Sequence, residues 1–356
     1  MTAGPAARAA ARMRPGTGLV RWLAAIGAGL AGFALFVAIA GGSPAAALQA
    51  IWSSTVVDAV GPGEVLVAAA PVILCALAVA IPAWAGLWNL GGEGQLVVGA
   101  IGATVVSQAL PSSLGSWAAL PLLLAGGAIG GALWCAIPAV LRVTVNLNEA
   151  ISSLLLSYVA LRLLDYLVNG PWKDPRSLGF PQAEPLPDGH RLGGLDWLPV
   201  AGGGRLHTGL LIALAAVAAA VVAHRHTTWG FRLRVVGGNG EAARRGGLPV
   251  KRLIVGAMVA GGALAGVAGM VQLSGVEFQA KGGIAGAYGF LGFLVSWLVR
   301  HDPRWIVLAG IAIGAVRVGG DALQIDANLP AASVNVLLAL LLLAILARGR
   351  GRRRSA

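Results

Sequence analysis

The hydropathy of this chain alternates between long apolar stretches and short charged segments from Val20 to Ala347. A helix of about 20 apolar residues crosses the roughly 30 Å hydrocarbon core of a bilayer. The pattern therefore predicts an all-α polytopic membrane protein with about ten transmembrane helices. We expect these spans near 20–40, 65–82, 90–110, 117–141, 149–168, 208–223, 253–273, 284–300, 304–320 and 332–347.

The composition supports this class. Hydrophobic residues make up 57% of the chain and charged residues 11%, whereas soluble domains carry about 25% charged residues. The 53 glycines suit the close packing of membrane helices. The two cysteines, Cys75 and Cys135, lie within apolar runs without CxxC or Cys/His spacing. We therefore expect buried thiols, with neither a disulfide nor a metal site.

The net charge of +12 indicates topology and not nucleic-acid binding, because the basic residues cluster beside the spans. With a cytoplasmic N-terminus, 19 of the 26 Lys and Arg residues lie on the inner side. Ten spans then place both termini in the cytoplasm. The first apolar run is too long for a signal peptide and is interpreted as a retained span. The expected organisation is a basic N-terminus at 1–19, a transmembrane domain at 20–347 with an outer loop at 169–207 and an inner loop at 224–252, and a basic tail at 348–356.

A polar segment between the second and third predicted spans carries Asn89, Glu93 and Gln95. Its three glycines in four positions, at 91, 92 and 94, disfavour a regular helix. A carboxyl group at membrane depth is costly and indicates function by default. The alternative is that Glu93 caps the N-terminus of the third span, where its charge suits the helix dipole. Both interpretations stay open.

The fifth predicted span carries a second polar group, formed by Ser153, Ser157 and Tyr158. Together with Asn89, Glu93 and Gln95, these residues are the predicted substrate path, because a polar ligand that crosses hydrocarbon needs hydrogen-bond partners. The alternative is hydrogen bonding between helices. Further along the same span, Arg162 and Asp165 are spaced to form an ion pair.

The basic inner loop contains a short predicted helix. Asn239 is a plausible N-cap, residues 241–245 favour helix, and Gly246 and Gly247 end it. The alternative for the charges alone is a solvated loop on the positive-inside face.

Several motifs in and around this loop resemble those of one known family. The loop carries Gly230, Phe231, Arg234, Val236, Gly237, Asn239, Ala242, Ala243, Arg244, Gly247, Leu248 and Val250, and further matching segments lie at 89–95, 148–153 and 170–175. The chain is similar over roughly 60–345 to permease subunits of bacterial ABC importers for nucleosides and simple sugars. These belong to the branched-chain amino-acid/ribose permease superfamily. The segment at 170–175 resembles the larger permease of the nucleoside-type pair.

The resemblance implies a pore-forming subunit that is not itself an enzyme and lies in the bacterial cytoplasmic membrane. Its implied partners are a second homologous permease, ABC ATP-binding subunits, an extracytoplasmic substrate-binding lipoprotein and the lipid bilayer, with no nucleic acid. ATP and Mg²⁺ would bind the partner ATPase, and this chain would hold no cofactor. The implied ATPase-coupling residues are Gly237, Asn239, Glu241, Ala242, Ala243 and Arg244.

The substrate stays open because the chain departs from the family pattern. At 289–299 bulky residues replace small or polar ones, and Ser157 stands where relatives commonly have Asn. A permease for branched-chain amino acids and an ATP-independent secondary carrier are the alternatives. An intramembrane enzyme is disfavoured because all five histidines fall in predicted loops. The chain also has no P-loop motif with which to hydrolyse ATP by itself.

Overall fold

The computed structural model describes residues 16–177, 179–201 and 204–326, with a few single positions beyond. The predicted tail at 348–356, most of the last predicted span and the first 15 residues lie outside the described part. Within the described part, all regular secondary-structure elements are helices, and β pairing is limited to two isolated bridges. The α-helices are α2 (Gly16–Ile39), α3 (Pro44–Trp52), α4 (Gly61–Trp84), α5 (Gly92–Ala109), α6 (Ser116–Val145), α7 (Glu149–Asn169), α8 (Gly209–His226), α9 (Thr228–Gly238), α10 (Gly240–Arg245), α11 (Val250–Gln272), α12 (Tyr288–Leu298) and α13 (Pro303–Asp326).

The chain divides into two compact units, of which Thr55–Val318 is the larger. The smaller unit combines residues up to Ser54 with residues from Gly319 onward. In this smaller unit α3 begins at Pro44 after the N-cap Ser43, whose hydroxyl accepts a hydrogen bond from the Ala46 amide at 3.4 Å. Proline suits this position because its missing N–H would be unpaired there in any case.

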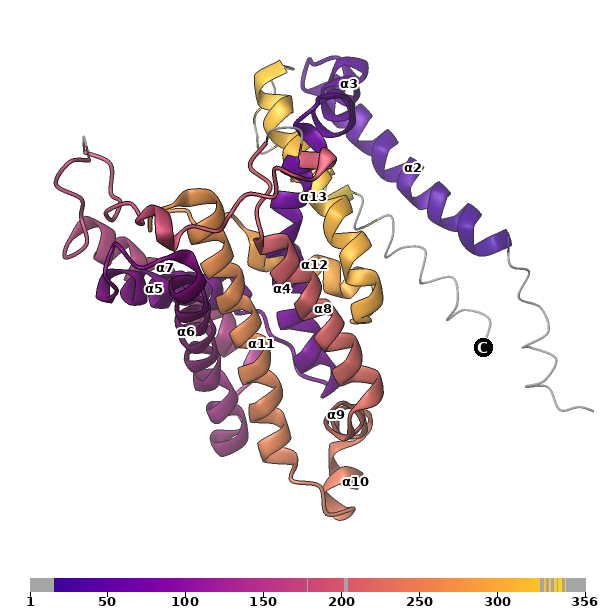
Figure 1. Cartoon of the computed structure of the whole chain (residues 1–356). Helices are drawn as coiled ribbons and strands as arrows, with labels where there is room; N and C mark the ends of the chain where they lie inside the picture. Colours follow the sequence, from indigo (N-terminus) through magenta and orange to yellow (C-terminus); the bar gives the residue numbers. More distant parts are fainter. Residues whose placement is uncertain are drawn as a thin grey trace, which may run out of the picture. The chain divides into compact units, whose positions relative to one another are not determined.

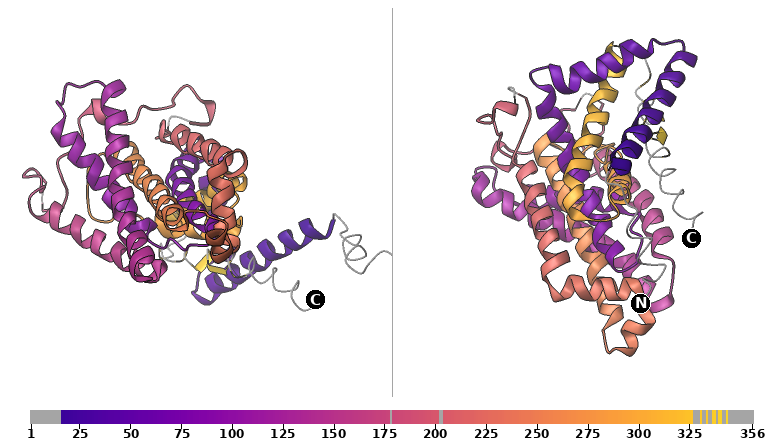
Figure 2. Two further views of the ribbon diagram at one scale, coloured as in Figure 1. Left: turned by 90° about the horizontal axis from the view of Figure 1, so that it is seen from below. Right: turned by 90° about the vertical axis from the view of Figure 1, so that its right-hand side faces the viewer.

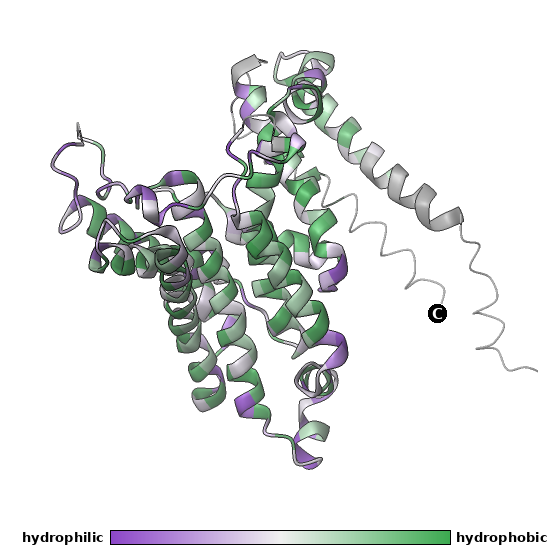
Figure 3. Cartoon of the chain, in the orientation of Figure 1, coloured by the Kyte–Doolittle hydropathy of each residue, from purple (hydrophilic) through white to green (hydrophobic). Residues whose placement is uncertain are grey.

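The all-α prediction is confirmed, and six helical stretches are long and apolar enough to cross a membrane. They are Gly61–Trp84, Ser116–Val145, Glu149–Asn169, Gly209–His226, Val250–Glu277 and Pro303–Gln324. Colouring by hydropathy shows apolar residues along their lengths and hydrophilic ones at α10 and in the 169–207 segment (Figure 3).

The predicted eighth span at 284–300 is longer than the helix found there. The helix α12 covers only Tyr288–Leu298, because residues 282–287 form turns. Two positions in these turns, Gly286 and Ala287, have positive φ angles of 51° and 62°. A left-handed backbone ends an α-helix, so this helix cannot begin earlier.

The centre of the larger unit is α4, which contacts α8, α11 and α12 (Figures 1 and 2). Almost every residue of α4 from Val65 to Trp84 is buried. A helix that is apolar on all sides is expected to be enclosed by other helices. The helix α4 therefore forms part of the core of this unit.

Glycines bring α5, α6 and α11 into backbone contact. A Cβ atom on Gly266 of α11 would collide with the carbonyl oxygen of Gly127 on α6, and one on Gly99 of α5 would collide with Gly266. Such contacts without side chains let helices approach closely in a membrane. Glycine is therefore required at these contact positions.

Two connecting regions lie at opposite ends of α8 (Figure 1). The 169–207 segment joins α7 to α8 and is anchored by Arg205, which forms an ion pair with Glu64 at 2.8 Å. A hydrogen bond of 2.7 Å between His190 and Ser107 attaches it to α5. Beyond the other end of α8, the helices α9 and α10 lead to α11.

Candidate functional site

The polar segment that carries Asn89, Glu93 and Gln95 runs without helix over 85–91 and continues into the first turn of α5. Asn89 and Gln95 exchange two side-chain hydrogen bonds, of 2.9 Å and 2.8 Å, and Asn89 also donates to the Ala78 carbonyl at 3.2 Å. Both amides are buried. Buried amides are stable only when paired, so this pair fixes the segment against α4 and the start of α5.

Two serines of α7 bind the backbone of the same segment. The Ser153 hydroxyl accepts from the Leu90 amide and the Ser157 hydroxyl from the Gly94 amide, both at 3.2 Å. A Cβ on Gly94 would lie 2.5 Å from the Ser157 Cα. Glycine is therefore required here by the close approach of α5 and α7.

Glu93 connects this segment to a helix almost two hundred residues later in the chain. Its carboxyl oxygens accept from the backbone amides of Ala287 at 2.9 Å and Gly289 at 2.8 Å. These amides belong to the start of α12, which has unpaired N–H groups and a favourable dipole for a carboxylate. Its own helix, α5, begins at the N-cap Gly91 without any side-chain cap. The Glu93 side chain therefore caps α12, while its position in the first turn of α5 also suits the dipole of that helix.

The predicted path residues thus form one buried group, with one exception. Asn89, Glu93, Gln95, Ser153 and Ser157 are each at most 5% exposed and connect α4, α5, α7 and α12. The exception, Tyr158, is 57% exposed on α7. We call these five buried residues the Glu93 network.

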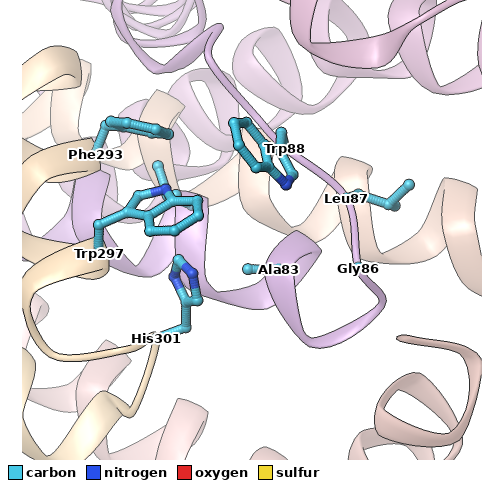
Figure 4. A pocket seen from close by; sticks show the side chains of 8 residues that line it. Ala83, Gly86, Leu87, Trp88, Phe293, Trp297 and His301 are labelled. Atoms are coloured by element: carbon cyan, nitrogen blue, oxygen red, sulfur yellow. The ribbon is translucent and has the colours of Figure 1, made fainter. Parts of the chain in front are cut away.

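An aromatic pocket of about 60 Å³ lies beside this network (Figure 4). Trp297 is at its centre, with ring centroids 5.1 Å from Trp88, 5.9 Å from Phe293 and 5.1 Å from His301. The pocket is lined by Val79, Ala83, Gly86, Leu87, Trp88, Phe293, Trp297 and His301. Sequence reasoning noted that residues 289–299 are bulky but missed the pocket, although the spacing of four between Phe293 and Trp297 places these two rings on one face of α12.

The turn between α12 and α13 closes one side of the pocket. The His301 carbonyl accepts from the Trp84 indole at 3.0 Å, and its imidazole contacts the Ser296 hydroxyl at 2.9 Å. Burial lowers the pKa of His301. A hydrogen bond from Arg304 lowers the pKa of the neighbouring Asp302 carboxyl. At neutral pH this turn therefore carries a neutral imidazole and an ionised carboxylate.

A further anchor that sequence reasoning missed is Glu149 at the start of α7. It pairs with Arg142 at 3.3 Å and accepts from the Trp88 amide at 3.2 Å. The helix start itself is capped by Asn148, which accepts from the Ala150 amide at 2.9 Å. The position of Glu149 in the first turn of a predicted span was the sequence signal that could have identified its contacts with Arg142 and Trp88.

The predicted short helix in the inner loop is present as α10. The Asn239 side chain accepts from the Ala242 amide at 3.0 Å. Glu241 pairs with Arg244 at 2.8 Å and with Arg245 at 3.1 Å. Ala243 is buried, whereas Glu241, Ala242, Arg244 and Arg245 are exposed.

This loop touches the start of the polar segment. A Cβ on Gly86 would lie 3.4 Å from the Cα of Gly237, and one on Gly237 would collide with the Trp84 carbonyl oxygen. The Trp84 ring also lies 4.5 Å from that of His224 at the end of α8. The last turn of α9 therefore lies directly on the chain that leads to Asn89.

Histidine positions differ slightly from expectation, because His224 and His226 lie in the last turn of α8 and not in a loop. No group of three or more His, Cys, Asp or Glu side chains able to hold a metal occurs among the described residues. Cys75 and Cys135 are both free and buried, as expected.

The helical fold and its apolar spans define a multi-pass membrane protein. Residues 61–346 match the family described as branched-chain amino acid transport system / permease component, and the chain belongs to this family. It is therefore related to transport subunits of ABC transporters, as the sequence motifs predicted.

Three relatives illustrate the similarity. The glucose ABC transporter permease protein TsgB13 of Haloferax volcanii is 37% identical, over 84% of this chain and 80% of the relative. The guanosine ABC transporter permease protein NupP of Bacillus subtilis is 31% identical, over 90% and 91%. The nucleoside ABC transporter permease protein NupB of Lactococcus lactis is 28% identical, over 78% and 76%.

Proposed function

We propose that this chain is a transmembrane subunit of an ATP-driven importer that carries a nucleoside or a simple sugar across the bacterial cytoplasmic membrane. Its family membership and relatives named for glucose, guanosine and nucleosides support the class and the substrate range. Two relatives from Bacillus subtilis, NupP and NupQ, are both named as guanosine permeases. This supports pairing of the chain with a second, homologous permease.

The remaining partners follow from the same proposal. ABC ATP-binding subunits bind ATP with Mg²⁺ and hydrolyse it, and an extracytoplasmic lipoprotein delivers the substrate. This chain contributes the membrane path and holds no cofactor of its own. The path borders the Glu93 network, with Tyr158 on the exposed side of α7.

The observation that carries the proposal is the contact between the inner loop and the polar segment. The backbones of Gly237 and Gly86 are packed together, only three residues before Asn89. Movement of α9 and α10 by an ATPase would therefore displace the polar segment directly. From Glu93, the connection continues into α12 through its bonds to Ala287 and Gly289.

The proposed topology places both termini in the cytoplasm and the 169–207 segment outside, with about ten spans. Its support is the basic inner loop at the end of α8 opposite that segment (Figure 1). Reporter fusions at residue 190 and at the C-terminus should report opposite compartments. If both fusions report the same compartment, this topology is wrong.

Two neighbouring glycines of α9 test the proposed coupling route, which runs from α9 through Gly86 to the polar segment and α12. Gly237→Ala places a methyl group against the Trp84 carbonyl, whereas a methyl group on Gly238 meets nothing within 4 Å. In the reconstituted complex, we expect Gly237→Ala to reduce ATP-driven uptake about tenfold, equivalent to about 1.4 kcal/mol of coupling. The matched control Gly238→Ala should retain wild-type uptake.

Co-purification of the ATPase subunits with each variant separates coupling from assembly. We expect both variants to retain these subunits, because the substituted positions are not on α10. Equal uptake by the two variants, with both complexes intact, would refute the proposed route.

A further inference from the structure

A basic hollow lies where α8 ends, between α9 and the turn that leads into α13. Its volume is about 430 Å³, and it is lined by His224, Arg225, His226, Arg234, Asp302 and Arg304. Three separate parts of the sequence thus direct guanidinium groups to one concave surface. We call this surface the basic hollow.

The positive charges of the basic hollow are only partly compensated. Arg304 pairs with Asp302 at 2.6 Å, and Arg234 donates to the carbonyl oxygen of His224. Arg225 forms no ion pair with any other described residue and is exposed. Three guanidinium groups against one carboxylate leave an excess of two positive charges. The hollow is therefore suited to an anion.

The position of the basic hollow identifies the kind of anion. It lies at the last residue of one candidate span, His226, and at the first residue of another, Pro303. The ends of membrane-spanning helices lie at the depth of the lipid headgroups. Basic pockets at this depth suit the phosphate groups of anionic lipids.

Apolar side chains continue from the basic hollow toward the membrane interior. Leu308 is 61% exposed and follows Arg304 by four residues, so both lie on one face of α13. Val222 is 52% exposed and precedes His226 by four residues on α8. Trp305, 55% exposed, has the side chain typical of the membrane interface. A charged hollow that leads into exposed apolar faces matches a headgroup with its acyl chains.

We propose that the basic hollow binds the phosphate of an anionic phospholipid, with acyl chains against Val222 and Leu308. Guanidinium groups favour phosphate because they donate two parallel hydrogen bonds to its oxygens. The proposal rests on the membrane location of the family and not on the proposed substrate. Loss of transport would therefore leave it unaffected.

The test measures lipid binding to the full chain purified in a neutral detergent. Thermal unfolding and native mass spectrometry are recorded with phosphatidylglycerol, phosphatidylcholine and inorganic phosphate as separate probes. Phosphatidylglycerol should raise the melting temperature and remain bound, whereas the other two probes should have little effect at the same concentration. Equal stabilisation by inorganic phosphate would identify a free-anion site and overturn the proposal, as would equal stabilisation by phosphatidylcholine.

Three substitutions localise the binding. Arg225→Gln should raise the half-saturating concentration of phosphatidylglycerol about fivefold, because each basic side chain near a lipid surface contributes about 1 kcal/mol. Arg225→Lys keeps the charge but loses the two parallel hydrogen bonds, so its affinity should lie between those of wild type and Arg225→Gln; it also controls for folding. The matched control Arg252→Gln removes an exposed charge of the same region outside the hollow and should behave as wild type.

Wild-type binding of phosphatidylglycerol by Arg225→Gln would overturn the proposal. If the same variant also releases the ATPase subunits from the complex, the hollow is assigned to a protein interface instead.

Discussion

Two regions of this molecule use the same residue types in opposite ways. Asn89 and Glu93 in the polar segment are buried, and Glu93 bonds to amides 194 and 196 residues later. Asn239 and Glu241 in the inner loop are exposed, and their bonds reach only three or four residues along α10. The polar side chains of the first region bond to several helices, whereas those of the second bond only within α10.

This difference predicts which substitutions change the stability of the chain and which change its binding to partners. A buried polar group that loses its partner costs the free energy of its desolvation. An exposed ion pair contributes little to stability, because water and salt screen it. Substitutions in the Glu93 network should therefore affect folding and transport together, and those on α10 should affect partner contacts alone.

The largest effect is expected at Gly289. A methyl group there would collide with the backbone nitrogen and Cα of Glu93, which cannot move aside as a side chain can. We expect Gly289→Ala to lower the free energy of unfolding by about 3 kcal/mol, the upper part of the usual range for overpacking. The measurement is thermal unfolding of the purified chain.

Gly256 of α11 provides the matched control for this substitution, since a Cβ there meets nothing within 4 Å. Gly256→Ala should leave stability unchanged or slightly raised, because alanine favours helix. Similar losses for the two variants would contradict the close packing of Gly289 on Glu93.

The next largest effect concerns the Glu93 carboxyl group itself. In Glu93→Gln only one side-chain oxygen remains to accept from Ala287 and Gly289, so one buried amide loses its partner. The expected loss is about 1–3 kcal/mol of unfolding free energy, with strongly reduced uptake. Glu241→Gln on exposed α10 should cost at most about 0.5 kcal/mol. Equal melting temperatures for these two variants would remove the distinction between the regions.

A smaller effect separates two neighbours on α7. Ser157→Ala removes the acceptor for the Gly94 amide and should cost about 1 kcal/mol. Tyr158→Phe changes a 57% exposed side chain and should leave stability as it is. Reduced uptake in Tyr158→Phe would place its hydroxyl on the substrate path, and wild-type uptake would remove it from the path.

The smallest effect on stability is expected when the ion pair of α10 is reversed. Glu241→Arg combined with Arg244→Glu and Arg245→Glu keeps opposite charges three and four residues apart, so stability should change by less than about 0.5 kcal/mol. Contact with the ATPase should nevertheless be lost, as measured by co-purification and substrate-stimulated hydrolysis.

The exposed pair Arg162 and Asp165 on α7 has the same spacing and serves as control. Its reversal should preserve ATPase binding. Unchanged binding after reversal on α10 would show that these charges are not part of the coupling surface.

Sequence alone predicted the features that depend on local spacing. The helix α10 forms with the expected Asn239 cap, and Arg162 pairs with Asp165 at 3.0 Å. Both depend on residues within one helical turn. Hydropathy likewise predicted the helical class, since apolar length is a property of single segments.

The partners of Glu93 were not predictable in this way. Its carboxyl group binds backbone amides, and every residue except proline carries such a donor, so no side chain in the sequence identifies them. The aromatic pocket joins Trp88 to Trp297 across more than two hundred residues. Only the packing of α4 against α12 brings these rings together.

The central claim is ATP-driven transport of a nucleoside or simple sugar, and uptake by the reconstituted complex tests it most directly. Proteoliposomes that contain the paired permeases, the ATPase subunits and the binding protein are supplied with labelled guanosine or glucose, with and without ATP. The account predicts uptake of at least one of these substrates that requires ATP and resists competition by leucine. Uptake that proceeds without ATP, or that only leucine inhibits, would contradict it.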